Sequence, residues 1–257
     1  MCVTNRIFNQ IAKLRRRINR ENNITPQTQA CSDLSVFDLE LMKSVESYTM
    51  TSMERRYNII NSVRYVSRFS IAGAIVECGV WRGESMMLAM KTLLNENIGD
   101  RCFFLYDTYQ GMPNPSEVDI DINGIFAKDR LAMDLGKKKE SDVWAISTLD
   151  EVKKNIESIG YPSTQIRFIE GKIEQTIPAT VPDAIAILRL DTDWYESTKH
   201  ELKHLYHLVS PGGVVIIDDY GYWSGARRAV DEFLEETNEK IFLQRIDQTG
   251  RCFVKPL

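Results

Sequence analysis

The sequence is poor in residues that carry thiolate, histidine and phosphate-loop chemistry. Its five cysteines are an odd number and form no CxxC pair, so neither a disulfide framework nor a zinc knuckle is indicated. Nothing marks Cys78 as a nucleophile, although it stands next to a candidate ligand-binding turn. The chain has no Walker A sequence and only three histidines, all in one expected helix, on the face opposite its leucines. A histidine metal site or a catalytic triad is therefore not expected.

Long apolar runs and an excess of positive charge are also missing. No segment reaches the roughly 18 apolar residues of a membrane span, and the N-terminus has no apolar signal region. The net charge of −4 gives no overall positive field. A basic cluster at residues 13–17 with Arg20 fits either an exposed helix face or a contact with phosphate. We expect a protein of the reducing cytoplasm with no nucleic-acid partner and no membrane insertion.

The length and composition predict one large α/β domain with an extension. The chain has 257 residues, 43% hydrophobic and 26% charged. Residues 1–70 have helical patterns, with Ile7, Ile11, Leu14 and Ile18 spaced by four, three and four, and a second helix expected over 51–69. We interpret 1–70 as a helical extension that serves as a lid or an oligomer arm, and we expect a homo-oligomer.

Residues 71–257 alternate short apolar runs with helical segments. Strands are expected at 74–78, 102–106, 166–169, 184–190, 214–217, 241–246 and 252–255, and helices at 84–95, 148–158, 196–209 and 225–238. A long polar loop fills 108–125. This alternation predicts a Rossmann-like, doubly wound sheet that is mostly parallel and covered on both faces. The last two strands, with Gly250 between them, would give it an antiparallel edge.

Ligands of such sheets bind beyond the carboxyl ends of the strands, so the residues there are informative. The first strand ends in "VECGVWRGES", where Gly79 and Gly83 permit a tight turn before a helix with free N–H groups. This is not the G-x-G-x-x-G pattern of pyrophosphate sites. The acidic Glu77 favours a cationic ligand with an amino group, and a purely structural turn is the alternative.

The second strand ends in "LYDT". An acid at the position of Asp107 can accept hydrogen bonds from both hydroxyls of a ribose, or it can simply cap a surface loop. Glu77 and Asp107 at the tips of neighbouring strands, together with the glycine turn, favour an adenosyl ligand.

Three aspartates follow the fourth and fifth expected strands. Asp191, Asp218 and Asp219 would meet in one cleft, and three carboxylates in contact repel each other unless one keeps its proton or a cation joins them. Oxygen ligands suit a hard divalent ion such as Mg²⁺. The alternative makes Asp193 and Asp219 N-caps of helices that begin at Trp194 and Tyr220.

Four stretches together resemble the macrocin O-methyltransferase family: "VECGVWRGES", "YDTYQGMP", "LRLDTDWYEST" and "GGVVIIDDYGYWSGARRAVDEF". They lie in the same order over residues 74–236. The resemblance implies a methyltransferase that uses S-adenosylmethionine and Mg²⁺ on hydroxyls of sugars or glycosylated natural products. It is looser with the cation-dependent catechol-type methyltransferases, which share the fold.

The resemblance also implies roles for individual residues. Asp191, Asp218 and Asp219 would bind the metal, Asp191 would also be the general base, and the 108–135 loop would close over the substrate. The residues implied at the cofactor are Glu77, Gly79, Val80, Gly83, Ser85, Asp107 and Thr108.

No motif in residues 1–50 identifies the acceptor, which could belong to a glycosylated antibiotic, a surface polysaccharide or a lipid-linked glycan. A non-catalytic relative that binds the nucleoside, and an NAD-dependent enzyme on a similar sheet, are the competing hypotheses.

Overall fold

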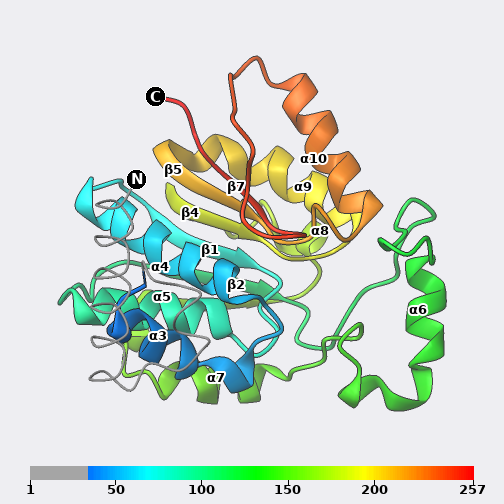
Figure 1. Ribbon diagram of the computed structural model, residues 1–257, viewed down its shortest axis with the longest axis horizontal. Coiled ribbons are helices and arrows are strands. Elements are labelled where there is room, and N and C mark those ends of the chain that lie inside the picture. Colours follow the sequence, from blue (N-terminus) through cyan, green and yellow to red (C-terminus); the bar gives the residue numbers. More distant parts are fainter. Residues whose placement is uncertain (1–33) are drawn as a thin grey trace, which may run out of the picture. The chain divides into compact units, whose positions relative to one another are not determined.

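A computed structural model of the protein describes residues 34–257 (Figure 1). The contacts of the described residues divide the chain between Glu40 and Leu41, a boundary that falls within helix α3 (Val36–Lys43). The expected helix with Ile7 and Ile18, and the basic cluster at 13–17, lie outside the described residues. The second unit holds the sheet. It also holds α4 (Met53–Arg68), which the sequence placed in the extension.

The sheet has seven strands in the order β3-β2-β1-β4-β5-β7-β6. The strands are Ala74–Cys78 (β1), Phe103–Asp107 (β2), Ile166–Glu170 (β3), Ile185–Leu190 (β4), Val209–Ile217 (β5), Gln244–Arg245 (β6) and Arg251–Val254 (β7). The first five in sequence pair in parallel, whereas β7 is antiparallel to β5 and β6 to β7. The predicted doubly wound sheet with an antiparallel edge is confirmed.

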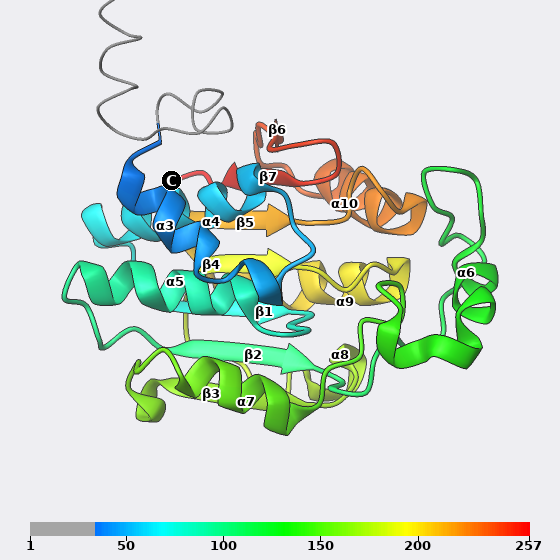
Figure 2. The ribbon, with the colours of Figure 1, turned by 60° about the horizontal axis from the view of Figure 1, so that its bottom comes forward.

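Helices cover both faces of this sheet (Figure 2). On one face lie α4, α5 (Glu84–Asn95) and α7 (Leu149–Glu157), and on the other α8 (Ile173–Thr176), α9 (Tyr195–Leu205) and α10 (Ser224–Glu236). Helix α6 (Ala127–Met133) lies beyond the carboxyl ends of the parallel strands. No helix among residues 34–257 is both long and apolar enough to cross a membrane.

Several boundaries differ from the expectation. The helix expected over 196–209 ends at Leu205, and a 3-10 turn, η4 (Tyr206–Leu208), leads to Val209, which already pairs with Ile185. The strand expected at 241–246 shortens to Gln244–Arg245. Further 3-10 turns are η1 (Glu46–Tyr48), η2 (Leu135–Glu140) and η3 (Ser163–Gln165). Helix α6, just after the predicted 108–125 loop, was not expected. It has seven residues, of which only Ala127 and Leu131 are buried, so its sequence shows little helical periodicity.

The alternation along β1 decides which side chains reach which face. Ala74, Val76 and Cys78 belong to the apolar core shared with α9, so Ile75 and Glu77 point to the face of α4 and α5. All five residues are buried. A buried glutamate needs a partner, because burying an unpaired carboxylate is strongly unfavourable. That partner stands on the next strand, in the site described below.

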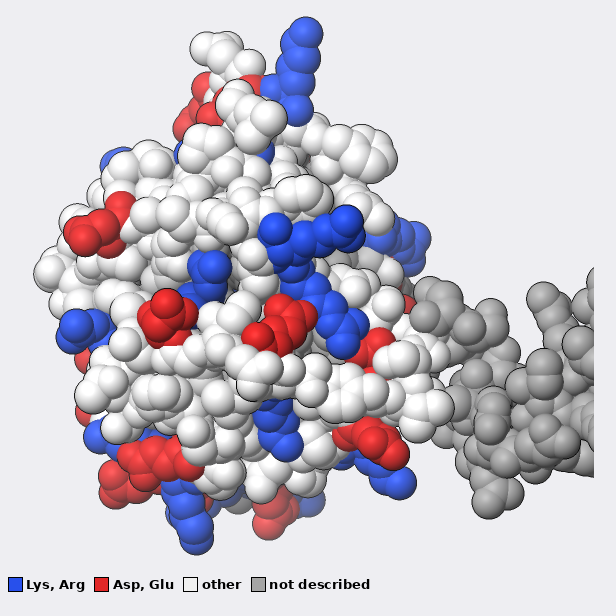
Figure 3. Space-filling view, turned by 90° about the vertical axis from the view of Figure 1, so that its left-hand side faces the viewer, with Lys and Arg blue, Asp and Glu red and all other residues white. Residues whose placement is uncertain are grey.

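The opposite end of the sheet has a different surface. Figure 3 views the side of the molecule where the parallel strands begin, away from α6. Basic and acidic side chains are interspersed there with neutral ones. The functional residues expected from the sequence all belong to the other end.

Candidate active site

A cavity of about 400 Å³ opens at the carboxyl ends of the parallel strands, where ligands of this sheet type bind. Every predicted site residue except Gly83 lines it. The cavity is also lined by segments that sequence reasoning did not assign to the site. They include residues 48–51, which precede α4, and Arg55, Glu84, Arg130, Arg189, Tyr222 and Trp223.

The glycine turn after β1 is shaped by close packing. Gly79 has φ +85°, and a Cβ there would lie 1.9 Å from the carbonyl oxygen of Asp191, so no other residue fits without a backbone shift. Its N–H donates to the carbonyl of Tyr106 at 2.9 Å. Gly83, with φ +89°, is the N-cap of α5 and packs towards Ile156. It therefore turns the chain without facing the cavity.

Asp107 holds this turn in place. Its Oδ2 accepts hydrogen bonds from the N–H groups of Val80 at 2.7 Å and Trp81 at 2.9 Å, and its Oδ1 accepts one from Tyr109 at 2.7 Å. Burial raises the pKa of Asp107, while these N–H donors lower it. Thr108 donates from Oγ1 to the carbonyl of Gly111 at 2.6 Å. The carboxylate thus organises the loop, and its contact with a ribose stays a prediction.

Arg189 is the central cation of the site, and sequence reasoning missed it. The register pairs Arg189 of β4 with Glu77 of β1, and both are buried on the same face. Its Nη1 lies 2.7 Å from Oε1 of Glu77 and 2.6 Å from Oδ2 of Asp191, and its Nη2 lies 2.7 Å from Oδ1 of Asp218. An arginine inside the apolar run 184–190 was the available signal, because a buried guanidinium requires carboxylate partners.

The three aspartates meet because the strand pairing continues past the strand ends. The N–H of Asp191 donates to the carbonyl of Cys78 at 2.8 Å, and the N–H of Asp218 donates to that of Leu190 at 2.9 Å. Carboxylate oxygens of Asp191, Asp218 and Asp219 lie within 4.8 Å of one another. Among residues 34–257 this is the only group of histidine, cysteine or acidic side chains with metal-site spacing. His200 lies outside the group, with its Nε2 2.8 Å from the carbonyl oxygen of Ile177.

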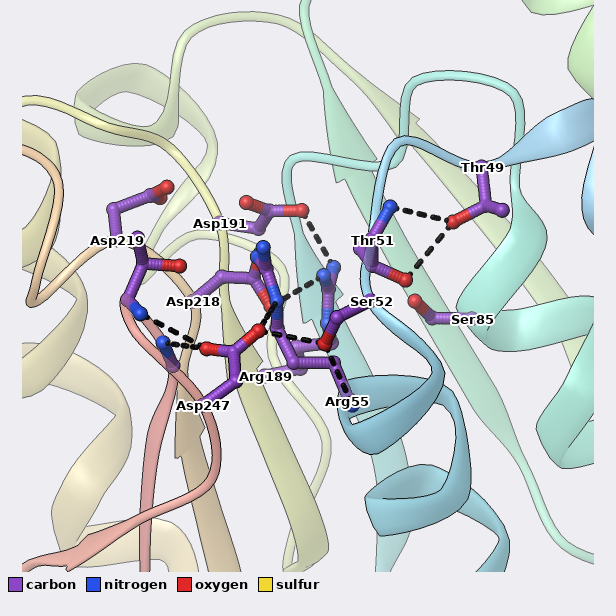
Figure 4. Close-up of polar contacts among 12 residues, drawn as sticks. Thr49, Thr51, Ser52, Arg55, Ser85, Arg189, Asp191, Asp218, Asp219 and Asp247 are labelled. Atoms are coloured by element: carbon purple, nitrogen blue, oxygen red, sulfur yellow. Dashed lines mark hydrogen bonds and ion pairs between the residues drawn. The ribbon is translucent and has the colours of Figure 1, made fainter. Parts of the chain in front are cut away.

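Arg55 supplies a second guanidinium from helix α4 (Figure 4). Its Nη1 contacts Oδ2 of Asp218, and its Nε lies 2.9 Å from Oδ2 of Asp247 in the turn between β6 and β7. Asp247 also accepts a hydrogen bond at 2.6 Å from Ser52, the N-cap of α4. Two arginines therefore relieve part of the repulsion among the three aspartates, for which the sequence suggested a metal ion.

Asp193 and Asp219 are not helix caps, which corrects the alternative drawn from the sequence. The N-caps of α9 and α10 are Trp194 and Trp223. Asp193 has φ +63° and donates its N–H to Oδ2 of Asp219 at 3.3 Å. Burial, with the charge of Asp191 next in size, raises the pKa of Asp193 to about 7, and burial beside Asp193 raises that of Asp219. These two carboxyl groups therefore keep their protons more readily than free aspartates, because the arginines do not relieve all of the repulsion here.

Two buried carboxylate oxygens of residues that line the cavity lack a hydrogen-bond partner. Oε2 of Glu77 and Oε1 of Glu84 make no hydrogen bond, and both residues line the cavity. Burial raises the pKa of Glu77 to about 8, with Arg189 opposing the rise, and it raises the pKa of Glu84 as well. Such a pair fits the ammonium group of a methionine moiety, and the oxygen-only aspartate cluster fits a hard divalent ion. Glu84 directly follows Gly83 and was overlooked.

Tyr222 and Trp223 give the cavity an aromatic wall, which lies beside a loop that is bonded to α9. Trp194 and Trp223 pack edge to face with ring centroids 4.9 Å apart. The fully buried Asp119 accepts a hydrogen bond from the N–H of Tyr195 at 2.8 Å and another from that of Ser116 at 2.6 Å. The middle of the 108–135 segment is therefore anchored on α9, and its role as a lid stays a prediction.

The fold and this site define a Rossmann-like methyltransferase. The solved structure of the O-methyltransferase NovP is 32% identical and superposes with a TM-score of 0.70, over 82% of this chain and 83% of that one. The calicheamicin methyltransferase CalS11 shares the fold at 16% identity, with a TM-score of 0.60 over 86% of this chain and 93% of its own.

The family model described as macrocin-O-methyltransferase (TylF) matches residues 7–255, so the chain belongs to this family and is an O-methyltransferase. Curated relatives include demethyldecarbamoylnovobiocin O-methyltransferase of Streptomyces niveus, 33% identical over 79% of this chain and 74% of that protein. Mycinamicin III 3''-O-methyltransferase of Micromonospora griseorubida is 31% identical over 79% of this chain and 77% of that protein. Membership confirms the family recognised in the sequence and implies S-adenosylmethionine as the methyl donor.

Proposed function

We propose that this protein methylates a sugar hydroxyl of a glycosylated natural product and that it requires Mg²⁺. The observation that carries the proposal is the meeting of Asp191, Asp218 and Asp219 in the same cavity as Glu77 and Asp107. Relatives named for novobiocin, tetracenomycin and mycinamicin substrates support the class of acceptor.

The donor end of the cavity would be formed by the turn after β1. The unpartnered oxygens of Glu77 and Glu84 would accept hydrogen bonds from the ammonium group and attract the positive sulfonium. Gly79, Val80 and Ser85 line the same wall, and Asp107 with Thr108 stands where a ribose is bound in related sheets. Gly83 would act indirectly, by setting the start of α5.

The metal end would be formed by Asp191, Asp218 and Asp219, whose oxygens suit a hard ion. A bound divalent cation lowers the pKa of a hydroxyl group and stabilises negative charge on its oxygen. Arg189 orients two of the three ligands, because it holds one oxygen each of Asp191 and Asp218. This arrangement leaves Oδ1 of Asp191 without a guanidinium partner.

Asp191 is the candidate general base. Burial raises its pKa to about 6, while Arg189 opposes the rise, so the carboxylate is mostly ionised at neutral pH and able to take a proton. Alignment of the acceptor oxygen with the donor methyl group would further accelerate transfer, because the reaction needs in-line approach at near-attack distance. The aromatic wall with Trp223 and Tyr222 would exclude water and offer rings against which a sugar can pack.

The proposal is tested by mass spectrometry of glycosylated acceptors incubated with the protein, isotopically labelled S-adenosylmethionine and Mg²⁺. We expect a labelled methyl group on one sugar hydroxyl, lost in excess EDTA and restored by added Mg²⁺. Transfer that persists in EDTA would remove the metal from the account. Binding of S-adenosylmethionine by calorimetry without transfer to any acceptor would favour the non-catalytic relative.

Asp191→Asn is the most informative variant in this assay, and Asp231→Asn on α10 is its matched control. Asp231 accepts a hydrogen bond from Tyr220 and does not line the cavity. We expect transfer by the first variant to fall by about a thousandfold or more, because the proposed base and one metal ligand are both lost. The control should stay within about twofold of the unsubstituted protein.

A further inference from the structure

Asp218 is the one proposed metal ligand with both oxygens already engaged by guanidinium groups. Its Oδ1 lies 2.7 Å from Nη2 of Arg189, and its Oδ2 contacts Nη1 of Arg55. Asp218 is 3% exposed. An ion that binds Asp218 must therefore share an oxygen with an arginine or displace one.

The two arginines differ in how readily they can leave. Arg189 is buried within β4 and is held by three carboxylates. Arg55 reaches the site from α4, its side chain is 18% exposed, and its Nε has a separate partner in Asp247 at 2.9 Å. Arg55 contacts Asp218 through Nη1 and Asp247 through Nε (Figure 4), so loss of the first contact would leave the second in place.

We propose that Arg55 is an internal counter-ion that competes with the divalent metal for Asp218. Without a metal, Arg55 neutralises Asp218; with one bound, the guanidinium would release Asp218 and keep its contact with Asp247. This inference rests on the proposed metal dependence and adds a positioning role for Arg55 that acts through Asp218. Its consequence is a metal affinity lower than three aspartates alone would give, because two cations close together in a partly buried site repel each other.

Competition predicts that two variants change the metal affinity in opposite directions. Arg55→Met removes the charge and keeps much of the side-chain volume, so divalent metal should bind about tenfold or more tightly. Asp247→Asn weakens the second partner of Arg55, which leaves the guanidinium more firmly on Asp218, and metal should bind several-fold more weakly. If the contacts of Arg55 with Asp218 and Asp247 were merely structural, both variants would bind the metal more weakly.

The test is titration of the full chain with Mn²⁺, followed by the electron paramagnetic resonance signal of free Mn²⁺. Circular dichroism checks that each variant is folded, and Arg228→Met on the exposed face of α10 is the charge-matched control. Opposite shifts for Arg55→Met and Asp247→Asn support the inference. A folded Arg55→Met variant with unchanged or weaker binding overturns it.

Three further outcomes are also decisive. If Arg55→Met does not fold, Asp247→Asn alone decides, and unchanged or tighter Mn²⁺ binding contradicts competition. If the unsubstituted protein binds Mn²⁺ but the Mn²⁺ affinities of the two variants do not change in opposite directions, only this inference fails. If neither the unsubstituted protein nor a folded Arg55→Met variant binds Mn²⁺, the proposed metal dependence fails with it.

Discussion

Glu77 and Arg189 lie opposite each other on neighbouring parallel strands, with Oε1 and Nη1 2.7 Å apart and both side chains buried. The same guanidinium reaches Asp191 and Asp218, so one cation connects the proposed donor end of the cavity to the proposed metal end. Removing one partner of a buried ion pair is more harmful than replacing the whole pair, because the remaining charges stay buried and uncompensated.

Arg189→Met should destabilise the protein severely. Glu77, Asp191 and Asp218 would each lose a charged partner, and the free energy of unfolding should fall by about 3–5 kcal/mol. Urea denaturation measures the change. Arg228→Met, which removes an exposed pair with Glu232 on α10, should leave it almost unchanged, because water screens a surface ion pair. Equal losses in the two variants would show that the Arg189 network contributes no more than a surface pair.

Gly79→Ala should disrupt the donor-binding turn. A Cβ at this position meets the carbonyl oxygen of Asp191 at 1.9 Å, so the turn or the aspartate must move. Gly124 is a matched control, because it has a similar φ of +81° but no atom within 4 Å of an added Cβ. We expect calorimetry to show loss of S-adenosylhomocysteine binding only in Gly79→Ala. Gly124→Ala should lose about 1–2 kcal/mol of stability through backbone strain alone.

Glu84→Gln should have opposite effects on binding and on stability. Glu84 is a buried carboxylate with one unpartnered oxygen and a raised pKa, so the neutral amide should stabilise the ligand-free chain. The same change removes an attraction for the donor ammonium, and S-adenosylhomocysteine should bind about tenfold more weakly. Thermal melts and calorimetry measure the two effects, with the exposed Glu235→Gln as control. Unchanged affinity would remove Glu84 from the donor site.

The metal-free protein should lose stability as the pH rises from 6 to 8. The pKa values of Glu77, Asp191 and Asp193 are raised to about 8, 6 and 7, so in this range the folded chain holds protons that the unfolded chain has released. This stabilisation is complete below pH 4 and disappears as the pH passes the folded values. In EDTA the melting temperature should fall by about 2 °C or more.

Asp219→Asn serves as the control for this pH dependence. Burial raises the pKa of Asp219, so this carboxyl group also holds a proton in the folded chain, and its replacement should flatten the decline between pH 6 and pH 8. Added Mg²⁺ should also flatten it in the unsubstituted protein, because an ion that binds the ionised aspartates stabilises the folded state. A melting temperature that rises with pH in EDTA would contradict the account.

The mostly parallel sheet and the meeting of the aspartates could be predicted because both follow from local patterns. Apolar runs that alternate with helical periods fix a parallel sheet, and acids after β1, β2, β4 and β5 must then share one edge. Arg55 could not be found in this way, since α4 reaches the site only through tertiary packing. Arg189 was visible in the strand but was passed over. The anchoring of Asp119 on α9 depends on loop contacts that leave no periodic signal.

The central claim is that Asp191, Asp218 and Asp219 jointly bind a divalent ion beside the methyl donor. A crystal structure with Mn²⁺ and S-adenosylhomocysteine, analysed by anomalous scattering, tests this most directly. The account predicts one manganese peak about 2.1 Å from an oxygen of each aspartate, with the Arg55 guanidinium on Asp247. A cavity that holds the nucleoside but no manganese, with Arg55 still in contact with Asp218, would contradict it.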